Sequence, residues 1–363
     1  MGDAYEEGGP RSRTVTSAGG LARHRRQNVA RERSLTMSTS FRFRRGRRVY
    51  VRAADEILAT LARDGTFEGL PFMPEMLRHC GQRFAVSHLM TKTCVEGHGL
   101  RQMDGTVSLE GLRCDGACHE GCERRCLLFW KEAWLSEQPP RRRAPAAGAA
   151  SASGLETRRG EQFVCQSTEL LRATAPLPAA KLFVYLRDVR LGEMSVEQFA
   201  RQAASGVSSR GRRLLGLYRD SQPRGCQSVT MEESLGLRPG DWVEVKSQEE
   251  IESTLNTEGK NRGLLFSATM LPYCGRRYRV AERLEKIIRE DTGRMVELRN
   301  TVILEGVVCA PPTCPRANLL YWREVWLRRL AAPDAAQDAE AGRASPLHSA
   351  QGACAARVVE VPR

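Results

Sequence analysis

Short runs of alternating apolar and polar residues recur along the chain and predict β-strands. VYVRA (49–53) and VEVKS (243–247) have this pattern, as do TVSLEGL (106–112) and TVILEGV (301–307). Successive side chains of a strand point to opposite faces, so alternation is typical of strands with one buried face. RFAVSHLMTK, RYRVAERLEK and the aromatic YWREVWL also favour strands, with a short helix as the alternative for YWREVWL.

Helical spacing appears between these strands and in the middle of the chain. DEILATLAR (55–63) and EEIESTLNT (249–257) place apolar residues at helical intervals behind acidic starts. KLFVYLRDVRLG predicts a helix ending at Gly192, and EQFVCQSTELL before it a strand. SVEQFARQAASG predicts a second helix, which opens with Ser195 and Gln198 in capping-box spacing and stops at Gly206.

The two sets of strands belong to one repeated pattern. Residues 49–86 align without a gap on residues 243–280, and LLFWKEAWL (127–135) matches LLYWREVWL (319–327). Identical pairs at the constant offset of 194 include Gly46 and Gly240, Val51 and Val245, Ile57 and Ile251, Gly65 and Gly259, Met76 and Met270, and Cys80 and Cys274. Such a period is too long for a solenoid and indicates a domain duplication.

Each repeat holds four or five short strands in about 90 residues, which favours a small curled β-barrel. RPGDWVEV (238–245) resembles the opening strand of SH3-like barrels, and CGRRYRV (274–280) is similar to their glycine-led strand. The resemblance implies a fold and no activity. We therefore predict a mainly β protein with short helices (β+α), built of two duplicated SH3-like small barrels with a helical insert between them.

The pattern divides the chain into six parts. We expect a disordered Arg-rich tail at 1–40, a first SH3-like repeat with a Cys-rich loop at 41–138, a flexible linker at 139–160, a helical insert at 161–235, a second SH3-like repeat at 236–331 and a disordered tail at 332–363.

The net charge of +13 raises the question of nucleic-acid binding. Residues 1–46 carry ten Arg against four acidic residues, and 141–159 carry five Arg against one, so these stretches hold +10 of the total. The predicted folded parts are nearly balanced, which weakens the nucleic-acid hypothesis and confines it to the Arg-rich tails. No apolar run is long enough to span a membrane, and the N-terminus has no signal-peptide pattern, so we expect a cytoplasmic protein with reduced thiols.

CDGACHEGCERRC (114–126) concentrates four cysteines and a histidine. Cys114 matches Cys309 in the second repeat, and Cys80 matches Cys274, which favours roles in the fold. Four further cysteines of the first repeat have no counterpart in the second and require a local explanation; they are Cys94, Cys118, Cys122 and Cys126. The candidate metal ligands are Cys114, Cys118, Cys122, Cys126, Cys94 and His119, with His98 as another possible fourth donor.

A turning loop can gather thiolates around zinc, which takes four S or N ligands in a tetrahedron. The alternatives are an iron–sulfur cluster, a disulfide or redox relay, and ordinary free thiols. The sequence has no P-loop, dinucleotide-binding, metalloprotease or nucleophile-elbow motif, and no catalytic residue is indicated. Trp130, Trp134, Trp322 and Trp326 recur at matched positions and favour core packing.

The leading hypothesis is thus a non-catalytic, zinc-stabilised binding or scaffold protein with a protein partner. A redox or iron–sulfur accessory protein or enzyme is one alternative, and a nucleic-acid-binding protein is the other.

Because the second repeat lacks the extra cysteines, we predict that residues 236–331 fold alone without metal. Circular dichroism and thermal unfolding in metal-free buffer check this. If the fragment is unfolded in metal-free buffer and folds when zinc is added, the inference that the second repeat needs no metal is wrong.

Overall fold

The computed structural model of the chain describes residues 41–140, 154–178, 181–214, 222–309 and 315–331. The described residues from Phe43 onward belong to one unit. Both predicted tails, and most of the predicted linker, lie outside the described residues. Within the described ranges, no helix has both the length and the apolar character needed to cross a membrane.

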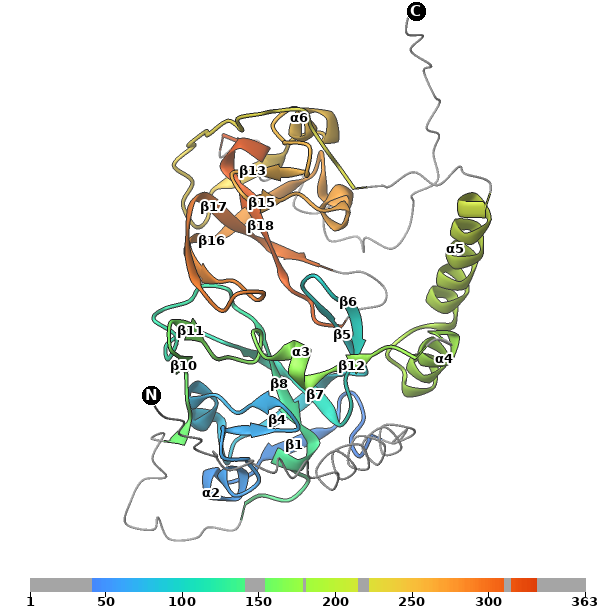
Figure 1. Ribbon diagram of the computed structural model, residues 1–363, viewed down its shortest axis with the longest axis vertical. Helices are drawn as coiled ribbons and strands as arrows, with labels where there is room; N and C mark the ends of the chain where they lie inside the picture. The colour runs from blue at the N-terminus through green and yellow to red at the C-terminus, as the bar shows by residue number, and fades with distance from the viewer. Residues whose placement is uncertain (1–40, 141–153, 179–180, 215–221, 310–314, 332–363) are drawn as a thin grey trace, which may run out of the picture. The chain divides into compact units, whose positions relative to one another are not determined.

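The first sheet has five antiparallel strands in the order β8-β7-β4-β1-β9. The elements of this first half are β1 (Arg48–Val51), α2 (Ala54–Leu58), β2 (Thr66–Phe67), β3 (Leu70–Pro71), η1 (Pro74–His79), β4 (Arg83–Leu89), β5 (Lys92–Val95), β6 (Gly99–Gln102), β7 (Thr106–Arg113), β8 (Leu127–Lys131), η2 (Glu132–Trp134) and β9 (Leu135–Ser136). Outside the five-stranded sheet, β2 pairs with β3 and β5 pairs with β6. The chain passes from β8 at one edge through the single turn η2 to β9 at the other. The sheet therefore curls into a half-barrel (Figure 1, blue to teal).

The second sheet has the order β18-β17-β16-β13-β19 and the same curl. The elements of this second half are β13 (Trp242–Val245), α6 (Gln248–Glu252), β14 (Lys260–Asn261), β15 (Leu264–Leu265), η4 (Ala268–Tyr273), β16 (Arg277–Ile288), β17 (Met295–Val308), β18 (Leu319–Arg323), η5 (Glu324–Trp326) and β19 (Leu327–Arg329). Outside the five-stranded sheet, β14 pairs with β15.

The run YWREVWL, predicted as a strand with a short helix as the alternative, contains both. Strands β18 and β19 are separated by the 3-10 turn η5, because the chain must cross from one sheet edge to the other.

The two sheets bury equivalent aromatic residues. Trp134 packs edge-to-face on Phe72 with ring centroids 5.2 Å apart, and Trp326 packs on Phe266 at 5.3 Å. The indole N–H of Trp134 donates to Thr60 at 3.2 Å, and that of Trp326 donates to Thr254 at 3.1 Å. All four repeated tryptophans are fully buried, which confirms their predicted role in core packing.

A connecting segment, residues 154–178, follows the first sheet and contains β10 (Arg158–Arg159), β11 (Gln162–Phe163), α3 (Leu170–Ala173) and β12 (Ala175–Pro176). The strand predicted over EQFVCQSTELL is limited to β11, and its end is α3.

Two longer helices come next, α4 (Lys181–Leu191) and α5 (Val196–Leu214). The capping box of α5 is present, since Ser195 and Gln198 exchange hydrogen bonds at 2.9 and 3.1 Å. The predicted stop at Gly206 is wrong, because one interior glycine costs only about 1 kcal/mol relative to alanine.

Helix α4 is fastened to the first half of the chain by a buried ion pair. The Asp188 carboxylate, 1% exposed, bonds the Lys92 ammonium and accepts a hydrogen bond from the Thr91 hydroxyl at 2.7 Å. Charges this deeply buried are tolerated only when paired.

We predict that Asp188→Asn destabilises the protein by about 3 kcal/mol, because it leaves the Lys92 ammonium buried without its carboxylate. Urea unfolding measures this change. Asp291→Asn, which removes the partner of the exposed Arg289, is the matched control and should cost less than about 1 kcal/mol. Equal effects of the two substitutions would contradict the role of the buried pair.

Candidate metal centre

The residues 114–126 form a cysteine-rich loop between β7 and β8, and hydrogen bonds within the loop fix its shape. The Cys114 N–H donates to the Cys126 carbonyl at 2.8 Å. The Gly116 carbonyl accepts from the N–H groups of His119 and Gly121 at 2.9 and 3.0 Å. Gly116 has a φ of +72°, and a Cβ there would lie 2.0 Å from the Cys122 carbonyl oxygen, so only glycine fits.

Glu75, Cys114 and His119 bring their donor atoms together at the base of this loop. The Cys114 thiol donates to Glu75 Oε1 at 3.1 Å, and His119 Nδ1 lies 3.1 Å from the same oxygen. All three donor atoms lie within 4.8 Å of one another, so the group can hold a metal ion. Sulfur, nitrogen and carboxylate oxygen are donors that zinc accepts.

Two buried polar atoms of this triad lack hydrogen-bond partners. They are Glu75 Oε2 and His119 Nδ1, the latter close to Glu75 but without hydrogen-bond geometry. His119 Nε2 lies 3.0 Å from the Val164 carbonyl, which can only accept, so Nε2 carries the proton. Burial acts to lower the pKa of His119, but the Glu75 carboxylate outweighs it and raises that pKa, so Nδ1 would release a proton on binding a metal.

The electrostatics of the triad disfavour nucleophilic catalysis by Cys114. Burial, followed by the Glu75 carboxylate, raises the pKa of the Cys114 thiol well above its usual range. Burial also acts to raise the pKa of Glu75, but His119 outweighs it and lowers that pKa. Because the thiolate is the nucleophile and the metal ligand, Cys114 needs a cation beside it to ionise.

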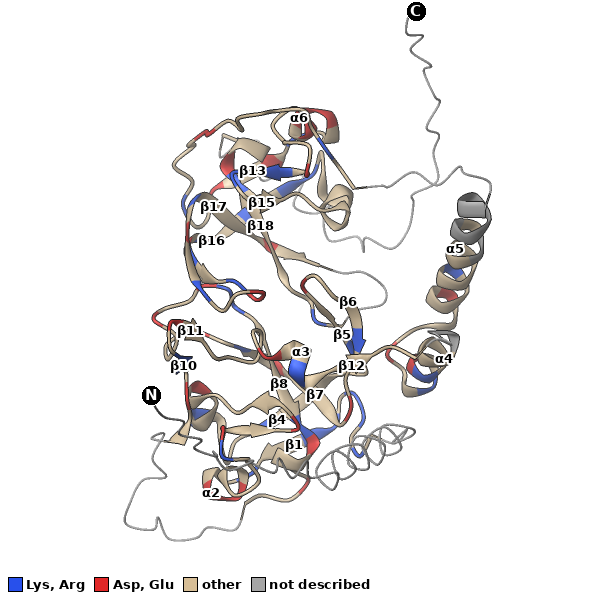
Figure 2. Cartoon of the chain, in the orientation of Figure 1, with Lys and Arg blue, Asp and Glu red and all other residues tan. Residues whose placement is uncertain are grey.

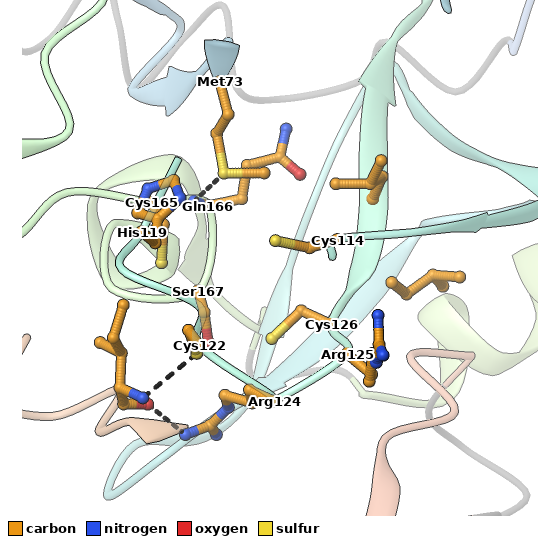
Figure 3. Close-up of a pocket in the computed structure, with 13 residues that line it drawn as sticks. Met73, Cys114, His119, Cys122, Arg124, Arg125, Cys126, Cys165, Gln166 and Ser167 are labelled. Carbon is orange, nitrogen blue, oxygen red and sulfur yellow. Dashed lines mark hydrogen bonds between the residues drawn. The ribbon is translucent and has the colours of Figure 1, made fainter. Parts of the chain in front are cut away.

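Next to the triad is a small pocket lined by four cysteines and Met73. Figure 3 shows the side chains of Cys114, Cys122, Cys126 and Cys165 around this common space. The lining also includes His119, Gln166 and Ile288. Among the described residues, the triad is nevertheless the only group of three or more donors within 4.8 Å of one another.

The structure separates the predicted ligands. Cys114, His119, Cys122 and Cys126 line the pocket, whereas Cys118 is exposed on the same loop. Cys94 lies on β5 outside the pocket lining, and its carbonyl accepts a hydrogen bond from Arg316 at 2.9 Å. His98 is exposed in the turn after β5.

Sequence reasoning missed two residues of this region, Glu75 and Cys165. Glu75 is absent from the second half, where Thr269 occupies the matching position beside Cys309. The comparison that singled out the cysteines would therefore have identified Glu75 as well. Cys165 lies in the connecting segment, outside both repeats, so it has no matching position in a comparison of the repeats.

The cysteine-rich loop also binds β16 of the second sheet. The Glu123 N–H donates to the Lys286 carbonyl at 3.0 Å, and the Ile288 N–H donates to the Cys122 sulfur at 3.3 Å. Arg124 Nη1 donates to the Ile288 carbonyl at 3.0 Å. These bonds satisfy backbone groups near the end of β16.

A buried ion pair lies beside this contact. Arg316 donates to both oxygens of Glu290, at 2.6 and 3.2 Å, and each residue is at most 6% exposed. Glu290 also accepts from Ser167 of the connecting segment at 2.9 Å and from Arg124 of the loop at 3.3 Å. Burial would raise the pKa of Glu290, but Arg316 and Arg124 outweigh it and lower that pKa.

Comparisons with protein-family models, with curated proteins and with solved structures give no match. The function is therefore argued from the geometry of the site.

The lowered pKa of Glu290 predicts an acid-dependent contribution to stability. The ionised carboxylate stabilises the fold fully above its ordinary pKa of 4.5, and this stabilisation is lost as pH falls through the lower folded pKa. We expect Glu290→Gln to cost about 3 kcal/mol at pH 7, and the difference from the unsubstituted protein to shrink below pH 4.5.

Denaturant unfolding across pH 3–8 measures this difference. Glu282→Gln is the control, because Glu282 pairs with Arg125 at 3.1 Å in a half-exposed position. A Glu290→Gln penalty that is the same at all pH values would contradict the assignment.

Proposed function

We propose that this chain is a non-catalytic, zinc-stabilised binding or scaffold protein, in which the cysteine-rich loop fastens two SH3-like barrels and the connecting segment together. A structural zinc ion at the loop supplies part of the folding free energy.

The strand order supports the fold part of this proposal. Both sheets follow the meander order of SH3-like barrels, with a 3-10 turn between the last two strands. Arg48 and Trp242, the first residues of β1 and β13, are 194 positions apart, which is the offset of the sequence repeat. The matched Trp–Thr and Trp–Phe contacts of the two cores also favour a duplication.

The convergence of Glu75, Cys114 and His119 is the observation that carries the metal part. These residues join η1 to the loop, and His119 joins the loop to the connecting segment through Val164. An ion bound here would fix a loop that touches three parts of the chain. Structural zinc contributes on the order of 10 kcal/mol in small zinc-dependent units.

A redox or iron–sulfur accessory function is the second candidate, favoured by the four cysteines around one pocket. Elemental analysis of protein purified without added metal separates the two. About one equivalent of zinc supports the structural role, whereas iron with labile sulfide supports the redox role.

Nucleic-acid binding through the Arg-rich tails has less support from the described residues. Basic and acidic positions are interspersed over both halves in Figure 2, and many arginines are paired with carboxylates, such as Arg328 with Glu244 at 2.8 Å. A DNA or RNA titration with and without residues 1–46 tests the tails, since tail-driven binding should vanish on truncation and fall steeply with salt.

We predict that Cys122→Ser in the full chain lowers the zinc content below one equivalent and lowers the unfolding temperature. The reason is that Cys122, a predicted ligand that lines the pocket next to the triad and accepts from the Ile288 N–H, could no longer supply sulfur to the metal. Metal analysis and calorimetry measure both changes. Cys80→Ala is the control, because half-buried Cys80 lies at the end of η1, away from the pocket, and should keep the metal. Full metal content and stability in Cys122→Ser would contradict the proposal.

A further inference from the structure

The pocket described above combines sulfur atoms from two separate parts of the chain. Cys114, Cys122 and Cys126 come from the cysteine-rich loop, and Cys165 comes from the connecting segment just after β11. Figure 3 shows all four around the same space, with Cys165 beside His119. Four sulfur donors are the number that a closed structural zinc site requires.

A backbone N–H group bonds one of these sulfur atoms, since Ile288 donates to Cys122 at 3.3 Å. Burial raises the pKa of the Cys114 and Cys165 thiols, and the nearby backbone N–H groups of Gly116 and Ser167 act in the opposite direction. N–H donors of this kind stabilise a thiolate, and they orient metal ligands from outside the coordination shell.

Arginine residues lie near the fourth sulfur, that of Cys126. Arg124 and Arg125 line the same pocket, and Arg113 Nη1 donates to the Arg125 carbonyl at 2.9 Å. Carboxylates pair with two of them, since Arg124 contacts Glu290 at 3.3 Å and Glu96 at 3.8 Å, and Arg125 contacts Glu282 at 3.1 Å. Zinc bound to four thiolates carries a net charge of −2, which the guanidinium groups would offset in part.

The segment that holds Cys165 is itself fixed against the loop. The Val164 carbonyl, next to Cys165 in sequence, bonds His119 Nε2 at 3.0 Å, and His119 in turn contacts Glu75 at 3.1 Å. The Gln166 amide donates to the Phe129 carbonyl and accepts from the Phe129 N–H, both at 2.8 Å. Cys165 thus lies between two residues that tie its backbone to the first half of the chain.

We propose that Cys165 is a metal ligand and that Cys114, Cys122, Cys126 and Cys165 form a four-thiolate zinc site. This inference rests on the proposed zinc-stabilised function and keeps Cys114 of the triad as a ligand while replacing Glu75 and His119. His119 and Glu75 then act as positioning residues that hold the Val164–Cys165 segment at the loop. Zinc–sulfur bonds of about 2.3 Å place tetrahedral ligands about 3.8 Å apart, closer than any three of these sulfur atoms lie here, so binding would draw them together.

X-ray absorption at the zinc edge of the full-length protein, purified without added metal, tests the ligand set directly. We expect four sulfur neighbours at about 2.3 Å and no nitrogen or oxygen at about 2.0 Å. A mixed shell with nitrogen and oxygen would point to Glu75, Cys114 and His119, and would overturn this ligand set while leaving the zinc-stabilised function in place. A protein that binds no zinc would overturn the proposed function and this inference with it.

Substitution of Cys165 gives an independent readout. We expect Cys165→Ser to weaken zinc binding more than the 10- to 100-fold typical of outer positions, as measured by competition with a chromophoric chelator. Cys118→Ser, an exposed position on the same loop, should retain the affinity of the unsubstituted protein. Unchanged affinity in Cys165→Ser would overturn the assignment. If Cys165→Ser fails to fold, the number of sulfur neighbours measured by X-ray absorption in the unsubstituted protein decides whether Cys165 is a ligand.

Discussion

The cysteine-rich loop has no large apolar side chain, so it cannot be fixed in place by hydrophobic packing. It is held instead by polar contacts, and these contacts connect the two halves of the chain and the connecting segment. Its thirteen residues, CDGACHEGCERRC, are cysteines, small residues and charged or polar ones. Even so, His119 is 1% exposed and Cys122 is 7% exposed. Hydrophobic burial cannot supply much of the free energy that fixes such a loop. The polar atoms must find partners instead, because each unpaired buried group costs about 1–3 kcal/mol.

Those partners come from three different places in the chain, and this is why the loop acts as a joint. Glu75 of η1 accepts from the Cys114 thiol, the Val164 carbonyl of the connecting segment accepts from His119, and the Ile288 N–H at the end of β16 donates to Cys122. The nearby Arg316–Glu290 pair follows the same principle. A buried ion pair adds little net stability over an apolar contact, but breaking it is costly. The pair therefore favours one arrangement of its neighbours over others, which suits a junction better than a core.

The sequence predicted the strands of both halves well because each half provides a check on the other. Val51 and Val245, or Trp134 and Trp326, reinforce one interpretation wherever the same pattern occurs twice. Cys165 could not be predicted in this way, because its position depends on long-range contacts that have no periodic signal. The end of α5 beyond Gly206 was missed for another reason, since a single glycine is a weak helix terminator.

On the proposed duplication, the two halves have diverged in complementary ways. The first half has the cysteine-rich loop, while the second has a longer hairpin, in which β16 spans twelve residues against seven for β4. The loop meets this hairpin near its end, at Lys286 and Ile288. Two identical halves would present identical surfaces, and a contact made within one chain could then form equally well between chains and extend into open assemblies. Because the loop is present only in the first half and the extended hairpin only in the second, the contact forms between these two different surfaces and not between two copies of the same half. The proposed metal site, which lies in only one half, would strengthen the same asymmetry, because it would fix the loop that makes this contact.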